Sequence, residues 1–128
     1  MAETDECPFC DALAEDSRVK LNTGHWFVVL DNHPVNKGHA LIIPKRHQPD
    51  IFSVDRYEWA VLMDAIDQTK EYLDQEFHPD GYNIGINCGE AAGQTVQHLH
   101  IHVIPRYKGD MENPRGGIRN FKTPLIPY

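Results

Sequence analysis

The sequence predicts a single α+β domain, in which one long helix packs on one face of an antiparallel sheet. Its 128 residues suit one compact domain. Short runs of β-forming residues occur in two groups, one before residue 45 and one after residue 80. Between the groups lies one segment with the apolar spacing of a helix. Strands that precede and follow a single helix are typical of the α+β class.

The first group of strands forms a predicted antiparallel pair. The run WFVVL at 26–30 is rich in β-formers, and the residues from Asp31 to Gly38 carry turn signals. A second apolar run at 40–43 follows and ends before Pro44. We therefore expect two strands joined by a loop.

The segment from Asp55 to Phe77 is predicted to be one amphipathic helix. Ser53 or Asp55 is available as its N-cap. The apolar residues recur at helical spacing, at Trp59, Leu62, Met63, Ile66, Leu73 and Phe77.

The second group of strands follows the helix. His78-Pro79-Asp80-Gly81 should end the helix, and 82–87 then alternates as a strand. After the turn-rich stretch 88–93, the last strand is expected at 98–104, stopped by Pro105. The tail 107–128 is rich in glycine, proline and charge, so we expect an irregular structure around a core of about 7–106.

Composition limits the partners. A net charge of −7 disfavours extended nucleic-acid binding, although a small phosphate ligand can still be held by local groups. No apolar run approaches the roughly 20 residues that a membrane helix needs. Residues 1–6 are acidic and lack the features of a signal peptide, so we expect no membrane association and a cytoplasmic location.

Three histidines alternate with apolar residues in the expected last strand. His98, His100 and His102 should share one face, because side chains alternate along a strand. One alternative is a solvated polar face. A second is one metal bound by all three, although the outer Cα atoms would lie roughly 13 Å apart. The third is chemistry at phosphorus, because a neutral imidazole is a competent nucleophile. The preceding turn GEAAGQTVQ offers amides and polar side chains for a phosphate cradle.

The motif CPFC places Cys7 and Cys10 at a spacing that lets two thiolates bind one zinc ion. Any remaining ligands must come from elsewhere in the chain, where histidines are plentiful. The alternatives are a reduced pair without metal and a redox dithiol. Three cysteines are too few for a disulfide framework, and Cys88 is expected to be a free thiol.

Several stretches together resemble the histidine triad family. HLHIHVI resembles the family signature HxHxHxx, and the flanking GQTV and PR look like its fragile-histidine-triad and bacterial branches. DNHPVNKGHALIIPKRH is similar to an earlier strand pair of the family, so the resemblance spans roughly 7–106. It implies a homodimeric fold, with a sheet of about five antiparallel strands, one long helix and a short N-terminal helix. It also implies transfer through a nucleotidyl-histidine intermediate.

The same resemblance implies roles for individual residues. His100 matches the nucleophile, His102 the histidine near the leaving-group oxygen, and His39 a histidine that helps orient the nucleophile. Taken alone, His39 is also compatible with a core histidine, Asp31 with a turn cap and Asn87 with a strand end. The expected substrate contacts are the ribose hydroxyls for Asp31 and the phosphates for Asn87, Gln94 and Thr95.

Zinc-containing relatives in this family complete a similar CxxC with two histidines. The matching set here is Cys7, Cys10, His47 and His98. Four protein ligands leave no open position, so this zinc would be structural.

The resemblance predicts a nucleotide hydrolase or transferase, and dinucleoside polyphosphates such as diadenosine polyphosphates are its first expected substrates. Asn87 instead matches the phosphoramidase branch, so nucleoside phosphoramidates, or nucleotidyl transfer, are the alternative. A non-catalytic zinc-stabilised nucleotide-binding module is a third hypothesis, but it should lack the middle histidine, and His100 is present. The family's RGGIR runs here into NFKTPLIPY, which leaves open any role of the tail in base selection.

Overall fold

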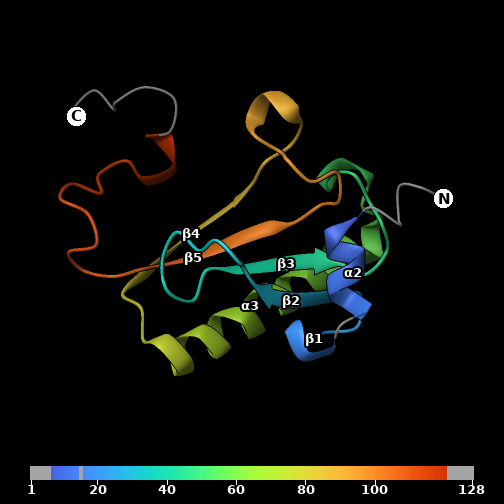
Figure 1. The fold of residues 1–128 in the computed structure, drawn as a ribbon, viewed down its shortest axis with the longest axis horizontal. Coiled ribbons are helices and arrows are strands. Elements are labelled where there is room, and N and C mark those ends of the chain that lie inside the picture. Colours follow the sequence, from blue (N-terminus) through green and yellow to red (C-terminus); the bar gives the residue numbers. More distant parts are fainter. Residues whose placement is uncertain (1–6, 15, 121–128) are drawn as a thin grey trace.

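A computed structural model describes residues 7–14 and 16–120, and its centre is one five-stranded antiparallel sheet (Figure 1). The strand order is β1-β2-β3-β5-β4. The strands are β1 (Val19–Asn22), β2 (Trp26–Leu30), β3 (Ala40–Pro44), β4 (Gly81–Ile86) and β5 (Ile101–Arg106). The predictions for residues 1–6 and 121–128 lie outside the described residues.

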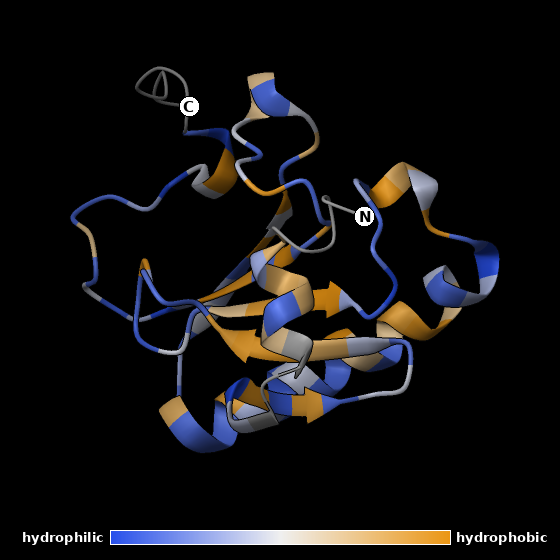
Figure 2. Cartoon of the chain, turned by 45° about the vertical axis from the view of Figure 1, so that its right-hand side comes forward, coloured by the Kyte–Doolittle hydropathy of each residue, from blue (hydrophilic) through white to orange (hydrophobic). Residues whose placement is uncertain are grey.

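Each face of the sheet is covered by a helix of different length. The long helix α3 (Arg56–Phe77) buries Leu62 and Leu73 against one face, which includes Trp26 and Ile42. The short helix α2 (Pro8–Ala14) lies on the other face. Apolar residues follow the strands through the centre of the molecule in Figure 2. The predicted α+β class, with one long and one short helix, is confirmed.

The ends of α3 follow from local chemistry. Asp55 caps the helix by accepting from the Glu58 N–H, and the Glu58 side chain accepts from the Asp55 N–H in return, which is a capping box. His78 ends the helix in the left-handed conformation, with φ of 53°. The predicted helix is therefore confirmed, but Trp59 and Met63 are 49% and 62% exposed and do not belong to the core.

The strand β1 was not identified from the sequence, where no run was singled out before Trp26. It has only four residues, and two of them, Lys20 and Asn22, are polar. It pairs with β2 through an irregular register near Val19 and Leu21. A short edge strand of this kind carries little apolar signal.

The last strand begins three residues later and ends two residues later than predicted, at Ile101–Arg106. The pairing of β5 with both of its neighbours begins at Ile101, which lies opposite Ile42 of β3 and Ile86 of β4. Pro105 lies inside β5 and does not stop it. The Pro105 carbonyl accepts from Asn36 Nδ2 and therefore points away from β4. In an antiparallel strand the nitrogen and the carbonyl of one residue point to the same side, so the missing N–H of Pro105 removes no hydrogen bond to β4.

After β5 the chain from 107 to 120 forms one 3-10 turn, η4 (Gly117–Arg119), and no strand or α-helix. Asp110 anchors its start by accepting from Asn36 Nδ2, from the Arg106 guanidinium and from the Tyr107 N–H. Nowhere in the described ranges is a helix both long and apolar enough to span a membrane.

Candidate active site and metal cluster

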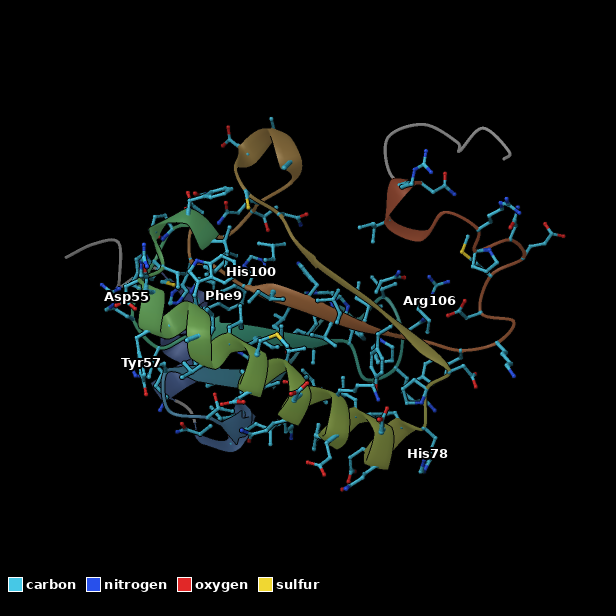
Figure 3. The ribbon with its side chains drawn as sticks, turned by 180° about the vertical axis from the view of Figure 1, so that it is seen from behind. Phe9, Asp55, Tyr57, His78, His100 and Arg106 are labelled. Carbon is cyan, nitrogen blue, oxygen red and sulfur yellow. The ribbon has the colours of Figure 1, made fainter. Side chains whose placement is uncertain are left out.

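His100 lies just before β5, on the sheet face opposite α3, and only 7% of it is exposed. Its Nδ1 is 2.9 Å from the carbonyl oxygen of His98. Because a carbonyl can only accept, Nδ1 carries the proton, and Nε2 of the neutral ring keeps its lone pair. Phe9 packs edge-on against the same ring at 4.8 Å (Figure 3). The backbone therefore fixes a nucleophilic tautomer of His100.

His39 fixes the tautomer of His102. The Val35 N–H donates to His39 Nδ1 over 3.0 Å, so the proton of neutral His39 sits on Nε2. This Nε2 is 2.9 Å from Nδ1 of His102, which accepts and keeps its own proton on Nε2. Burial, then the nearby His100 and His39, lower the pKa of His102 to about 4. At neutral pH His102 is thus an uncharged N–H donor.

His39 therefore acts directly on His102. The resemblance assigns it to orienting the nucleophile, whereas its hydrogen bond joins it to His102, whose ring centroid lies 5.1 Å from that of His100. Burial also lowers the pKa of His39, although Asp31, with Oδ2 at 3.6 Å, opposes this shift.

A cavity of about 460 Å³, here named the histidine cavity, opens in front of these rings. Its volume is in the usual range for small-molecule sites. Asp31 borders it, and the Oδ1 atom of Asp31 accepts from the His33 N–H. Asn87, Thr95, His100 and His102 border it as well. Apart from Gln94, all the predicted substrate-binding residues therefore share this cavity.

Gln94 is the predicted phosphate residue that the structure does not bring to the cavity. It is buried, and its Oε1 accepts from the Gly89 N–H while its Nε2 donates to the carbonyls of Pro49 and Val96. The amides of Ala92, Gly93 and Gln94 also donate within the same turn. The Gln94 side chain thus stabilises the turn by hydrogen bonds to backbone groups. Of the two neighbouring predicted residues Gln94 and Thr95, only Thr95 borders the cavity.

Cys7, Cys10, His47 and His98 form a second cluster, in which one ligand atom from each residue lies within 4.8 Å of all the others. Nδ1 of His98 is 3.2 Å from Sγ of Cys7, and Nδ1 of His47 is 3.4 Å from Sγ of Cys10. Zn–S and Zn–N bonds of about 2.3 and 2.1 Å in a tetrahedron give S···N separations of roughly 3.6 Å. The donor set and its spacing fit zinc.

The tautomer of His98 also fits a metal. Nε2 of His98 donates to the Pro44 carbonyl over 2.9 Å, which leaves the lone pair on Nδ1, the atom that faces the sulfurs. Burial and the adjacent Cys7 raise the pKa of Cys10 to about 11, so a nearby cation is needed to favour its thiolate.

The segment from Pro44 to Pro49 supports both sites. Besides the Pro44 carbonyl and His47, it offers the Gln48 carbonyl, which accepts from the Leu99 N–H over 2.6 Å. Buried Glu58 holds the Gln48 side chain at 2.7 Å and pairs with Arg46 at 3.0 Å. This network was not predicted from the sequence, because the position of Glu58 indicates only a helix-capping residue and not its contacts with Arg46 and Gln48.

Comparisons with known proteins show the family and agree with the fold. The model of the HIT domain family matches residues 13–109. An uncharacterised HIT-like protein of Methanocaldococcus jannaschii is 38% identical over 108 residues, or 83% of each chain. The bis(5'-adenosyl)-triphosphatase of Dictyostelium discoideum is 36% identical over 101 residues, or 79% of this chain and 68% of the relative. The crystal structure of a zinc-bound histidine triad family protein from Mycobacterium smegmatis superposes with a TM-score of 0.76 and 33% identity, over 86% of this chain and 81% of that one.

Proposed function

Because this chain belongs to the HIT domain family, we propose that it is a hydrolase that passes a nucleotidyl group from a conjugate to His100 and then to water. The observation that carries the proposal is the bond from Nδ1–H of His100 to the His98 carbonyl, which leaves Nε2 free in a residue that lines the histidine cavity. A buried imidazole held in this tautomer suits nucleophilic attack on phosphorus.

The first step joins Nε2 of His100 to the α-phosphorus, while the bond from phosphorus to the leaving group breaks and its electron pair leaves with that group. The Nε2–H of His102 donates a hydrogen bond to the departing atom, which takes any proton it needs from solvent. The His98 carbonyl stabilises the positive charge that develops on His100. In the second step water attacks phosphorus, the P–N bond breaks, its electron pair returns to Nε2, and a water proton passes to solvent.

Two substrate classes are candidates. Dinucleoside polyphosphates are supported by the resemblance to the Dictyostelium triphosphatase. Nucleoside phosphoramidates are supported by Asn87, which borders the cavity and matches the phosphoramidase branch. Assays of purified protein with diadenosine triphosphate and with adenosine phosphoramidate test the proposal. Release of AMP from neither substrate would contradict it.

Asp31 is proposed to bind the ribose hydroxyls. Asp31→Ala should weaken AMP binding about tenfold, because a charge-assisted hydrogen bond is lost, and should weaken 2'-deoxy-AMP binding much less. Calorimetry measures the affinity of each variant for both ligands. General damage to the site would weaken both ligands equally, so the ratio of the AMP affinity to the 2'-deoxy-AMP affinity reports only the lost contact with the ribose hydroxyl. Asn32→Ala, which changes the next residue on the cavity wall, is the matched control. Equal losses for the two sugars would exclude this role.

The cluster of Cys7, Cys10, His47 and His98 is proposed to hold one structural zinc ion. The zinc-bound relative from Mycobacterium smegmatis supports this assignment, as do the spacing and the tautomer of His98. The ion would join the segment of Cys7 and Cys10 to the residues next to the nucleophile.

A homodimer formed through β4 is also proposed. This strand is the last of the sheet, so one of its edges has no partner strand among the described residues. Ile84 in its middle is 43% exposed. A strand edge without a partner strand, which carries an exposed apolar residue, favours pairing with a second copy.

Ile84→Lys should therefore convert a dimer into a monomer, because it places a charge at that edge. Light scattering after size-exclusion chromatography measures the change. Met63→Lys alters an equally apolar, exposed residue on α3 and should leave the dimer intact. A monomeric wild type, or a dimer that survives Ile84→Lys, would be inconsistent with this interface.

A further inference from the structure

The loop between β2 and β3 sets the proton positions of two histidines in the site. The Val35 N–H donates to Nδ1 of His39, and Nε2 of His39 donates to Nδ1 of His102. The proton that His102 offers on Nε2 therefore depends on where the loop places one backbone N–H. Because a hydrogen bond weakens steeply when its geometry is lost, this proton position is only as secure as the loop.

A tight turn leads from this loop into His39. The Asn36 carbonyl accepts from the His39 N–H over 3.1 Å, and Gly38 takes the left-handed conformation, with φ of 86°. A Cβ added to Gly38 would lie 2.8 Å from Cδ2 of Phe77, so one side of the turn packs directly on the end of α3.

Asn36 joins the turn to residues 105–110, here named the clamp segment. Its Nδ2 donates to the Pro105 carbonyl over 3.0 Å and to Oδ2 of Asp110 over 2.8 Å. A carbonyl and a carboxylate can only accept, so both protons of the amide are used and the orientation of the amide is fixed. An acidic side chain of the same shape could make neither bond.

The clamp segment is held by its own charges. The Arg106 guanidinium donates to both carboxylate oxygens of Asp110, over 2.8 and 2.7 Å, and the Asp110 side chain is only 13% exposed. The guanidinium and the Tyr107 N–H hold the pKa of Asp110 well below its usual range, so it remains a carboxylate. The Tyr107 hydroxyl donates to the Lys37 carbonyl over 2.7 Å, which adds a second contact to the turn. Figure 3 shows Arg106 at the far end of the last strand from His100.

We propose that Asn36 and Asp110 are positioning residues for His102, and that they act by holding the loop that places the Val35 N–H. The Tyr107 hydroxyl has the same role. The kinetic consequence rests on the proposed function, in which His102 donates to the departing atom, whereas the tautomer of His102 does not. Loss of this tautomer should matter most when the leaving group is strongly basic, because such a group needs the hydrogen bond most.

The kinetic test compares two AMP esters of similar shape, one of phenol and one of the much less basic p-nitrophenol. Asn36→Asp replaces a donor with a carboxylate that faces Asp110. It should lower kcat/KM about tenfold for the phenyl ester and about twofold or less for the p-nitrophenyl ester. Adding Asp110→Asn returns a donor to this pair and should recover most of the lost ratio between the two esters.

A milder variant keeps the proposal testable even where Asn36→Asp does not fold. Tyr107→Phe retains the ring and removes only the hydroxyl, so it should change the ratio between the esters in the same direction, by about twofold. Tyr82→Phe is the matched control. It removes a hydroxyl that donates to Asp74 over 2.6 Å, away from the loop, and should leave the ratio unchanged.

The tautomer can be measured without any substrate. Heteronuclear NMR of protein with isotope-labelled histidine distinguishes a protonated ring nitrogen from an unprotonated one, and the His102 signals are those absent from His102→Asn. In the wild type, Nε2 of His102 should be protonated and Nδ1 should not. Asn36→Asp, and to a smaller extent Tyr107→Phe, should move both signals towards intermediate positions.

Unchanged His102 signals in both variants, or equal losses of kcat/KM for the two esters, would overturn the positioning role and leave the clamp segment with a role in stability alone. The hydrolase proposal is decided separately. Cleavage of neither ester by the wild type contradicts the hydrolase, and the NMR comparison then decides the positioning role by itself.

Discussion

Replacing His100 with alanine is expected to reduce kcat by about four orders of magnitude while changing nucleotide affinity by less than about threefold. Removing a nucleophile raises the barrier of the chemical step, whereas the nucleotide contacts proposed for Asp31 and Asn87 are left intact. Steady-state kinetics and AMP calorimetry on the same preparation separate the two effects. His25→Ala, which removes an exposed histidine that packs on Tyr57, is the matched control.

The covalent intermediate gives a second measurement. Acid quench during turnover of a slow substrate should add the mass of one nucleotidyl group to the peptide that carries His100. Free imidazole should restore part of the activity of His100→Gly, because it can occupy the vacated space. Near-normal turnover in His100→Ala, or an adduct on a different peptide, would refute nucleophilic catalysis by His100.

Loss of the proposed zinc site is expected to have the largest effect on stability. Cys7→Ser should lower the zinc content from about one ion per chain to near zero and should lower Tm by about 10 °C or more, because structural zinc binding is coupled to folding. Elemental analysis and thermal unfolding measure both quantities. Cys88→Ser changes a cysteine outside the cluster and should retain zinc.

A chelator provides an independent check. It should destabilise the wild type and leave Cys7→Ser unchanged, because the variant has no site to empty. A wild type that contains no metal, and that has the same Tm with and without added zinc, would rule out the proposed zinc site.

Much of the fold could be predicted because its signals are local. The cap at Asp55 and the spacing of Leu62 and Leu73 determine where α3 lies. Trp59 and Met63 share the same apolar pattern but face outward, since periodicity does not tell a core contact from an uncovered surface. The short strand β1 carries too little apolar signal to be found.

The candidate site was predicted in part, because residue types and their spacing indicate which side chains could act. They do not indicate where each proton sits. The tautomer of His100 depends on the His98 carbonyl, and that of His102 depends on the Val35 N–H acting through His39. Gln94 shows the same limit, because one of its partners, the Pro49 carbonyl, is a backbone group distant in the sequence.

The segment from Pro44 to Pro49 has a consequence for how this protein tolerates change. Three of its four contributions to the sites come from carbonyl oxygens, those of Pro44, Gln48 and Pro49. Every amino acid supplies a carbonyl, so these contacts do not depend on which side chains the segment carries. A one-residue insertion or deletion would displace all of them at once. The length of this segment is therefore a stronger constraint on the two sites than its side chains, apart from His47.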